Sequence, residues 1–182
     1  MGIEAALNKA WEDLKGSGKD KPLGASFIGA DYSVDLERKE VLSSRDGTKV
    51  KDYFALLILH YILKQGTAST PSGEWISFRD LDAGEFYYPV FRKRAIEPVL
   101  GKYGANPFGI FNNAQKIDAK KIDMADAAVE VKVFEKVPVA VLLWKSDDEL
   151  PADANILFKE NIKQIFGTED IAVISEIVAS KL

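Results

Sequence analysis

One apolar run, YFALLILHYIL from Tyr53 to Leu63, dominates the hydrophobic pattern of the chain and has lysines on both sides. A helix that is apolar on every side has to be covered on every side, so the run predicts a buried helix of about three turns. It has about half the length that crossing a bilayer requires, which favours a core helix over a membrane span. We expect the rest of the chain to pack around this central helix.

Helical periodicity recurs at both ends of the chain. Ile3 to Lys15 has apolar residues three or four positions apart, and residues 16–22 (GSGKDKP) are typical of a flexible connector. Near the other end the pattern predicts helices at Ala154 to Phe166 and at Thr168 to Leu182. A further helix is expected from Phe86 onward, with Pro98 kinking or splitting it.

Shorter segments predict strands. Ala25 to Ala30 is small and apolar, Tyr32 to Glu37 alternates, and Glu40 to Ser43 is expected to return after a tight turn. Ala127 to Glu135 alternates valine with charged residues, as a half-exposed strand does. Pro138 to Trp144 is apolar throughout and suits a central strand. Only a short turn separates these last two segments, so they should pair antiparallel.

These elements together predict an α+β fold. We expect residues 1–182 to form a single domain, in which residues 1–22 are the N-terminal helix and its connector. Its antiparallel sheet should have about five strands, packed by the buried central helix and by several flanking helices. The length of 182 residues and the 47% hydrophobic and 29% charged content agree with one globular domain.

Charge and the N-terminal sequence narrow the functional classes. The formal net charge is −4, and a mildly acidic protein gains no long-range attraction to phosphate backbones, so nucleic acid is not an expected partner. The N-terminus, MGIEAALNKAWEDLK, lacks the basic and apolar regions of a signal peptide. The expected compartment is therefore the cytoplasm, without membrane association.

The chain has no cysteine and one histidine, His60. The absence of cysteine excludes disulfides, thiolate catalysis, cysteine-ligated zinc and self-ligated iron–sulfur clusters. A single histidine excludes the two-histidine zinc motifs. His60 alone would suffice as one axial ligand of a haem or corrin, although no motif supports this. The other reading of His60 is a buried neutral histidine with one hydrogen bond.

Three segments resemble a prokaryotic family known as domain of unknown function 3786. They are LLILHYIL, then GEWISFRDLDAGEFYYPVFRKR, then the stretch from Val137 to Val178 that begins VPVAVLLWKSDDEL. The resemblance implies an α+β domain without an assigned activity, in a family common in anaerobic bacteria and archaea. Some relatives carry an added cysteine-rich iron–sulfur segment. That feature does not transfer to this cysteine-free chain, but it associates the fold with redox or cofactor proteins.

Aromatic and arginine side chains concentrate between Trp75 and Arg94. Rings stack on planar ligands and guanidinium groups bind carboxylate or phosphate at two points, so the segment is a candidate site for a planar or anionic small molecule. The residues expected to contact it are Trp75, Arg79, Tyr87, Tyr88, Arg92 and Arg94. The alternative is that the rings are ordinary core and that the arginines pair with Asp80, Asp82 and Glu85.

A second polar cluster, Ser146-Asp147-Asp148-Glu149, follows the predicted central strand. Adjacent carboxylates can help to hold Mg²⁺ or Ca²⁺. However, consecutive side chains do not converge on one ion, and the spaced pattern of calcium loops is absent, so a solvated turn is favoured and no metal site is predicted.

The absence of a catalytic motif favours a non-enzymatic binding or accessory protein, acting on a small molecule or a partner protein in anaerobic or redox metabolism. One alternative is an enzyme of small-molecule metabolism with Asp147, Asp148 or Asp80 as its acid or base. Another is a homo-oligomeric scaffold in which Tyr87 and Tyr88 form the interface. A concave pocket reached by Arg79 or Arg92 would favour binding, and two carboxylates in a cleft would favour catalysis.

Overall fold

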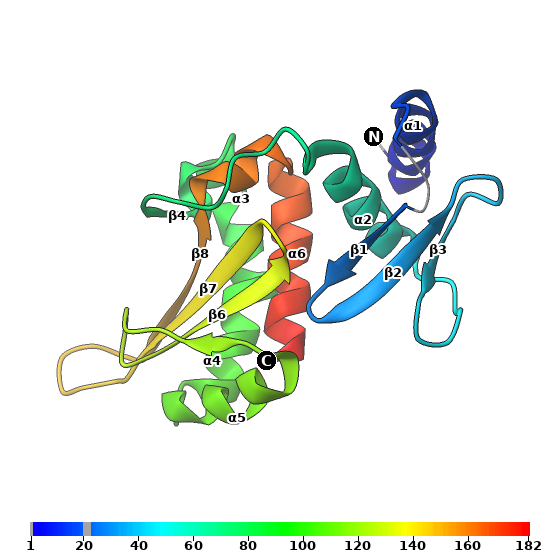
Figure 1. Ribbon diagram of the computed structural model, residues 1–182. Helices are drawn as coiled ribbons and strands as arrows, with labels where there is room; N and C mark the ends of the chain where they lie inside the picture. Colours follow the sequence, from blue (N-terminus) through cyan, green and yellow to red (C-terminus); the bar gives the residue numbers. More distant parts are fainter. Residues whose placement is uncertain (1, 20–22) are drawn as a thin grey trace.

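The computed structural model describes residues 2–19 and 23–182, which form two antiparallel sheets with helices packed around them (Figure 1). Residues 20–22 of the predicted connector lie outside the described residues. The N-terminal part contains one sheet, in the order β1-β2-β3, and two helices. Its elements are α1 (Ile3–Gly16), β1 (Leu23–Phe27), β2 (Ala30–Asp35), β3 (Glu40–Ser43) and α2 (Asp52–Lys64).

The C-terminal part contains the larger sheet, in the order β4-β8-β7-β6-β5. Its helical elements are α3 (Gly84–Phe91), a π-helical segment (Arg92–Ile96), α4 (Glu97–Tyr103), α5 (Ile110–Ala114) and α6 (Thr168–Lys181), with 3₁₀ turns at Phe78–Asp80, Pro107–Gly109, Gln115–Ile117 and Glu160–Gln164. Its strands are β4 (Trp75–Ser77), β5 (Lys120–Lys121), β6 (Ala127–Phe134), β7 (Val137–Trp144) and β8 (Asp153–Lys159).

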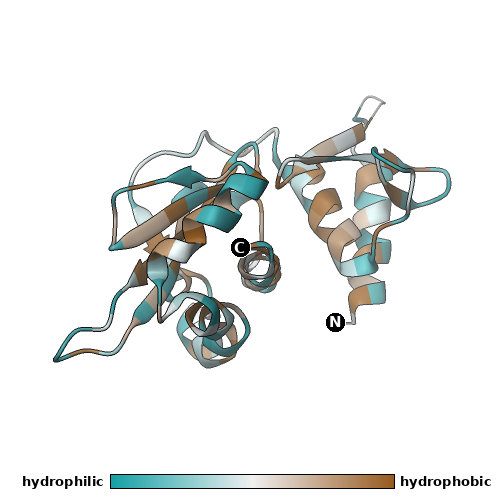
Figure 2. Cartoon of the chain, turned by 90° about the horizontal axis from the view of Figure 1, so that it is seen from below, coloured by the Kyte–Doolittle hydropathy of each residue, from teal (hydrophilic) through white to brown (hydrophobic). Residues whose placement is uncertain are grey.

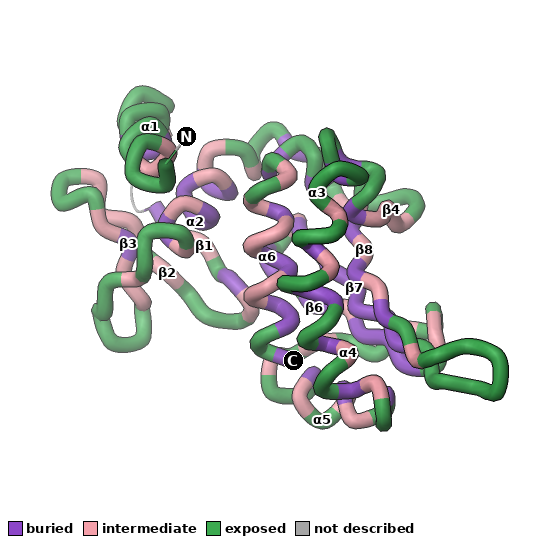
Figure 3. Tube along the Cα trace, turned by 180° about the vertical axis from the view of Figure 1, so that it is seen from behind, coloured by how far each residue is buried: buried purple, intermediate pink, exposed green. Residues whose placement is uncertain are grey.

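The α+β class and a five-stranded antiparallel sheet are confirmed, with the apolar strand β7 at the centre of that sheet. Of the five strands predicted from the sequence, however, only β6 and β7 belong to this sheet, and the other three form the smaller one. Alternate residues of β6, β7 and β8 point toward α4 and α6, which cover one face of the sheet. Val131, Val141 and Ile156 on this face are completely buried. Figure 3 shows buried positions following these strands and α6. The position of α6 against both β6 and the π-helical segment creates the site described below.

The central helix α2 is buried along most of its length, but it is covered mainly by α1 and the smaller sheet. Figure 2 shows apolar positions along both helices near the N-terminus. Contact with the larger sheet runs through Phe134 of β6, whose ring stacks on Tyr61 at 4.1 Å and meets Phe27 of β1 edge-on at 4.9 Å. Because the buried apolar residues of both parts form one connected cluster, α2 is one side of a shared core rather than its centre.

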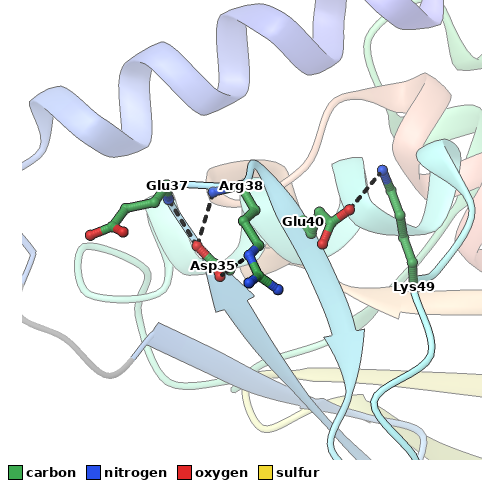
Figure 4. A network of polar contacts seen from close by, with 5 residues as sticks. All are labelled: Asp35, Glu37, Arg38, Glu40 and Lys49. Carbon is green, nitrogen blue, oxygen red and sulfur yellow. Dashed lines mark hydrogen bonds and ion pairs between the residues drawn. The ribbon is translucent and has the colours of Figure 1, made fainter.

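The three N-terminal strands form a separate sheet because tight turns return the chain at once. Ile28 and Gly29 both have positive φ, of 46° and 74°, and make a two-residue hairpin turn between β1 and β2. The predicted strand Ala25 to Ala30 therefore crosses a turn. At the β2–β3 turn, Asp35 accepts backbone hydrogen bonds from Glu37 at 2.9 Å and Arg38 at 3.0 Å, next to a Lys49–Glu40 ion pair (Figure 4).

The predicted helix Ala154 to Phe166 is wrong: its first half is strand β8 and its second half is a 3₁₀ turn. Ala154, Ile156 and Phe158 are buried at a spacing of two, which is the period of a strand. Ile162 is buried as expected, but in the turn. The apolar residues of this short segment fit the period of a helix as well as that of a strand. Its hydrogen-bonded pairing with β7 and β4 decides in favour of the strand.

The predicted helix from Phe86 begins at Gly84 and continues through the π-helical segment into α4. Pro98 has no N–H to donate to the carbonyl four residues before it. The chain accommodates this by a wider turn, in which the Glu97 N–H bonds to the Arg92 carbonyl five residues back. The expected disruption at Pro98 is confirmed, and it takes the form of a π-turn that contains Arg92 and Arg94.

Candidate functional site: an apolar pocket between α3 and α6

The six residues predicted to bind a ligand lie in three different places. Tyr87 and Arg94 line a pocket between α3 and α6. Arg79, Tyr88 and Arg92 form a neighbouring cluster that does not line it, and Trp75 belongs to the far side of the larger sheet. The segment is therefore structurally divided, and only part of it faces a cavity.

The pocket has a volume of about 460 Å³, within the range of small-molecule sites. Positions 87, 90, 91 and 94 fall on one side of α3 and the π-helical segment because residues three and four apart share a helix face. Phe78 enters from the 3₁₀ turn before α3, and α6 supplies the opposite wall. The lining residues are Phe78, Tyr87, Val90, Phe91, Arg94, Thr168, Glu169, Ala172 and Glu176.

Buried rings form the floor of the pocket and exposed apolar side chains form its rim. Phe78 and Phe91 are 1% and 2% exposed and stack with their centroids 3.9 Å apart and their planes at 10°. Tyr87 and Val90, by contrast, are 51% and 53% exposed. Large apolar side chains that remain half exposed beside a cavity are typical of a binding surface. Phe86, which is 80% exposed, meets the Tyr87 ring edge-on.

The backbone next to the pocket is held closely by Gly84 and a capping box. Ser77 and Asp80 cap the 3₁₀ turn that carries Phe78, with Asp80 accepting the Ser77 N–H at 2.7 Å. This hydrogen bond lowers the pKa of the Asp80 carboxyl group. A Cβ at Gly84 would overlap the Phe78 carbonyl oxygen. Gly84 therefore permits a close approach of two chain segments.

An ion pair lies at the polar end of the pocket. Arg94 approaches Glu176 of α6 at two points, with Nε 2.8 Å from Oε1 and Nη2 3.0 Å from Oε2. The Glu176 side chain is 25% exposed, so the pair is partly shielded from water. Thr168 donates its hydroxyl to the Asp82 carbonyl at 2.7 Å, which ties the start of α6 to the loop before α3. Glu169 is exposed at the pocket wall and, within residues 2–19 and 23–182, has no ion-pair partner.

Arginines 79 and 92 both interact with Tyr88 on the side of α3 away from the pocket. The Arg79 guanidinium lies 3.8 Å from the centre of the Tyr88 ring and 2.6 Å from Glu85. Its pKa is raised chiefly by the hydrogen bond to Glu85. Arg92 lies 3.5 Å from Asp153, and its pKa is raised chiefly by its hydrogen bond to Tyr88. The Arg79–Glu85 pair agrees with the alternative interpretation of this segment. Arg92 and Arg94 also form ion pairs, but with Asp153 and Glu176, which the sequence did not indicate.

Trp75 is separated from the other five residues by the larger sheet. It packs with Leu157, Ala140 and Leu142 on the face that α4 and α6 do not cover. Lys159 lies 4.3 Å from the centre of its ring, a cation–π contact. Trp75 therefore cannot reach the pocket.

His60 lies at a second, smaller cavity of about 240 Å³ on the other side of the α6 N-terminus. Its Nδ1 is 2.8 Å from the Asp170 carboxylate, a partner that the sequence did not indicate. The histidine is half buried and its expected single hydrogen bond is present. The contact joins α2 to the first turn of α6 across 110 residues of sequence.

The acidic turn after β7 is exposed, as the solvated-turn reading predicted. Asp147 accepts backbone hydrogen bonds from Glu149 at 2.9 Å and Leu150 at 2.8 Å, which lower the pKa of its carboxyl group. Its carboxylate thus stabilises the turn. Among the described residues, no three histidine or acidic side chains are placed to hold a metal ion together.

Comparison with known proteins decides the family. A model of the family described as domain of unknown function (DUF3786) matches residues 7–181. The chain belongs to the DUF3786 family. No curated protein and no solved structure shows a significant match to it. Within the described part of this DUF3786 chain, no helix combines the length and the hydropathy that spanning a membrane requires.

Seven of the nine lining residues were not among the contacts predicted from the sequence. None of them carries a motif: Phe78, Val90 and Phe91 fall inside the aromatic and arginine segment, and Thr168, Glu169, Ala172 and Glu176 lie on α6 beside its buried stripe. Positions 169, 172 and 176 do share a helix face, which is a detectable signal. What the sequence does not show is that this face lies against a helix about eighty residues earlier, since no local pattern encodes such a distant pairing.

Proposed function

We propose that this DUF3786 protein is a non-enzymatic domain that binds a small, largely apolar molecule in the pocket between α3 and α6. The observation that carries the proposal is the cavity of about 460 Å³, with half-exposed Tyr87 and Val90 above the stacked rings of Phe78 and Phe91. A ligand that covers the rim would remove this apolar surface from water, at roughly 25 cal/mol per Å².

The pocket also differs from the form first expected. Arg94, rather than Arg79 or Arg92, is the arginine that lines it. Its guanidinium group is already paired with Glu176, so two-point binding of an anionic ligand by this arginine is not supported. Apolar burial, with polar groups at one end, is the recognition that the lining supports.

A catalytic role receives less support. Glu169 and Glu176 are two carboxylates in one cleft, the arrangement expected of an enzyme. They are seven residues apart on α6, which separates their backbone positions by about 10 Å. Glu176 is bound to Arg94. Of the three acids first considered, Asp80 caps a 3₁₀ turn, Asp147 stabilises the turn after β7, and Asp148 is exposed in that same turn. Most of these carboxylates therefore already have structural roles, and the binding proposal does not require any of them to act as an acid or a base.

A neutral fluorescent probe tests the proposal. N-phenyl-1-naphthylamine is uncharged at neutral pH and gains fluorescence when it leaves water, and we expect saturable binding to the full chain. Val90→Trp should fill the mouth of the pocket and abolish binding. Phe108→Trp is the matched control, since it introduces a tryptophan at another exposed apolar side chain that does not line the cavity, and this variant should bind as the parent does. Binding that survives Val90→Trp would place the probe elsewhere and contradict the proposal.

Native mass spectrometry of freshly purified protein complements the probe. A co-purifying small molecule would be expected on the parent protein and absent from Val90→Trp. The same spectrum reports the assembly state, so it also tests the scaffold alternative, which expects a dimer that Tyr87→Ser dissociates.

A further inference from the structure

The charges around the pocket specify the kind of molecule that it accepts. The lining contains one basic side chain, Arg94, and two acidic ones, Glu169 and Glu176. Arg94 and Glu176 neutralise each other through their two-point contact. The remaining charge is the exposed carboxylate of Glu169, which no ion pair within the described ranges neutralises. The pocket is therefore net negative.

The N-terminus of α6 acts in the opposite sense but is the weaker effect. A helix N-terminus carries roughly half a positive charge, which favours anions. The full carboxylate of Glu169 lies in the first turn of α6 and on the pocket wall, and it more than offsets this half charge. An incoming anion would also lie beside Glu169 and Glu176, whereas a cation would lie beside them favourably.

The rings add an attraction of the same sign. Aromatic faces carry negative charge density and attract ammonium groups, more strongly where water is excluded. Tyr87 presents a half-exposed ring at the mouth, and the Phe86 ring lies edge-on to it with planes at 87°. Tyr87 and Glu169 come from facing helices and line the same cavity.

We infer that the pocket, if it binds small molecules as proposed above, selects organic cations: amines or quaternary ammonium compounds with an apolar body. The apolar body lies against Phe91, Val90 and Ala172. The ammonium group lies at the mouth, between the Glu169 carboxylate and the Tyr87 ring. The Arg94–Glu176 pair stays intact and closes the polar end.

Three probes with one carbon skeleton test this inference by calorimetry: 4-phenylbutylamine, 4-phenylbutanol and 4-phenylbutyrate. The amine should bind most tightly and the carboxylate least. Ion pairs and cation–π contacts at exposed sites each change affinity by about two- to fivefold, so the amine should exceed the alcohol by roughly four- to twenty-fivefold. Rising salt should narrow the difference.

Uncharged substitutions test which residues cause the preference for the amine. Glu169→Gln should weaken amine binding about two- to fivefold and leave the alcohol unchanged. Glu149→Gln removes the same charge from the exposed acidic turn, outside the pocket, and should alter neither. Tyr87→Leu keeps an apolar side chain but should weaken the amine about two- to fivefold relative to the alcohol.

The outcomes separate this inference from the proposed function. If the alcohol binds and displaces N-phenyl-1-naphthylamine, but the amine binds no better than the carboxylate, the charge preference is wrong and the pocket remains a binding site. If neither the naphthylamine nor any of the three probes binds in a manner sensitive to Val90→Trp, the proposed function itself fails. A preference for the amine that Glu149→Gln reduces as much as Glu169→Gln would show general charge attraction and overturn the assignment.

Discussion

Two cavities flank the first turn of α6, and they differ in size and chemistry. One, of about 460 Å³, is walled by rings and aliphatic side chains from α3. The other, of about 240 Å³, is lined by the hydrogen-bonded His60 and Asp170 and by charged side chains of α1 and α2. Consecutive helix residues point about 100° apart, so Glu169 and Asp170 face different cavities.

The difference shows how one helix end serves two purposes. Toward α2, Asp170 is engaged in a contact that joins the two parts of the chain. Toward α3, Glu169 is unpaired within the described ranges and the neighbouring apolar side chains remain half exposed. A hydrogen-bonded polar pair contributes to stability, whereas an exposed charge without an ion-pair partner beside exposed apolar surface favours binding. The predictions below separate these roles, in decreasing order of expected effect.

The floor and the rim of the large pocket should differ most. Phe91→Ala removes a ring that is 2% exposed and stacked on Phe78, and should lower the free energy of unfolding by about 3–5 kcal/mol. Val90→Ala, at the adjacent position that is 53% exposed, should cost less than about 1 kcal/mol. Urea denaturation followed by circular dichroism measures both. Equal losses would show that the rim belongs to the core.

The contact at the small cavity should contribute measurably to stability. A double-mutant cycle with His60→Ala and Asp170→Asn should give a coupling of about 0.5–1.5 kcal/mol, because the pair is half buried and separated by 2.8 Å. Neither change should affect binding of N-phenyl-1-naphthylamine. A coupling near zero would mean that the contact does not hold α2 to α6.

The ion pair of the large pocket should contribute less. Arg94 is 54% exposed and Glu176 25% exposed, so solvent screens their attraction. A cycle with Arg94→Met and Glu176→Gln should give a coupling of about 0.5–1 kcal/mol, reduced by added salt. A coupling well above that of the His60–Asp170 pair would contradict this expectation, because the contact at the large pocket would then stabilise the fold more than the contact at the small one.

The capping box beneath the pocket floor should produce a small dependence on pH. The folded pKa of Asp80 lies below its ordinary value of 3.8, so the native state favours the ionised carboxylate. Its contribution is therefore fully present above pH 3.8 and is lost as the pH falls through the lower folded pKa. Asp80→Asn should lower the free energy of unfolding at pH 6 by no more than about 1 kcal/mol, since the carboxylate is exposed.

Denaturation of the parent and of Asp80→Asn at pH 6 and again near pH 2.5 measures this dependence. The difference between the two proteins should shrink at the lower pH. A difference that grows as the pH falls would show that the sign of the linkage is wrong.

The sequence predicted some elements closely because their signals are local. The run at Tyr53–Leu63, the alternation in β6 and the apolar strand β7 each reflect a period that a helix or a strand requires. The secondary structure around Ile156 and Phe158 was harder to predict, because a short apolar segment fits both the helical and the strand period. Only pairing with β7 and β4 decides between a helix and a strand. The split of the strands into two sheets depended on the turn at Ile28 and Gly29, where φ is positive in both residues although one is isoleucine.

The aromatic and arginine segment shows the same difference between local signals, which the sequence contains, and long-range packing, which it does not. Its composition indicated the correct region, and two of the six predicted residues, Tyr87 and Arg94, line the pocket. Trp75 and Arg92 were assigned with them because they are close in sequence. In the structure, Trp75 lies on the other face of the larger sheet and Arg92 lies on another side of the helix. The composition of a segment does not indicate such a separation.

By itself, the sequence of this DUF3786 protein determined which segments are buried, the period of most of them, and the exclusion of cysteine and two-histidine metal chemistry, because burial and ligand chemistry are properties of individual residues. Only the tertiary structure decided that α6 lies against α3, that Glu176 neutralises Arg94 and that Glu169 remains free within the described ranges. Those relations join residues about eighty positions apart, and the free energy that selects them comes from packing the shared core as a whole.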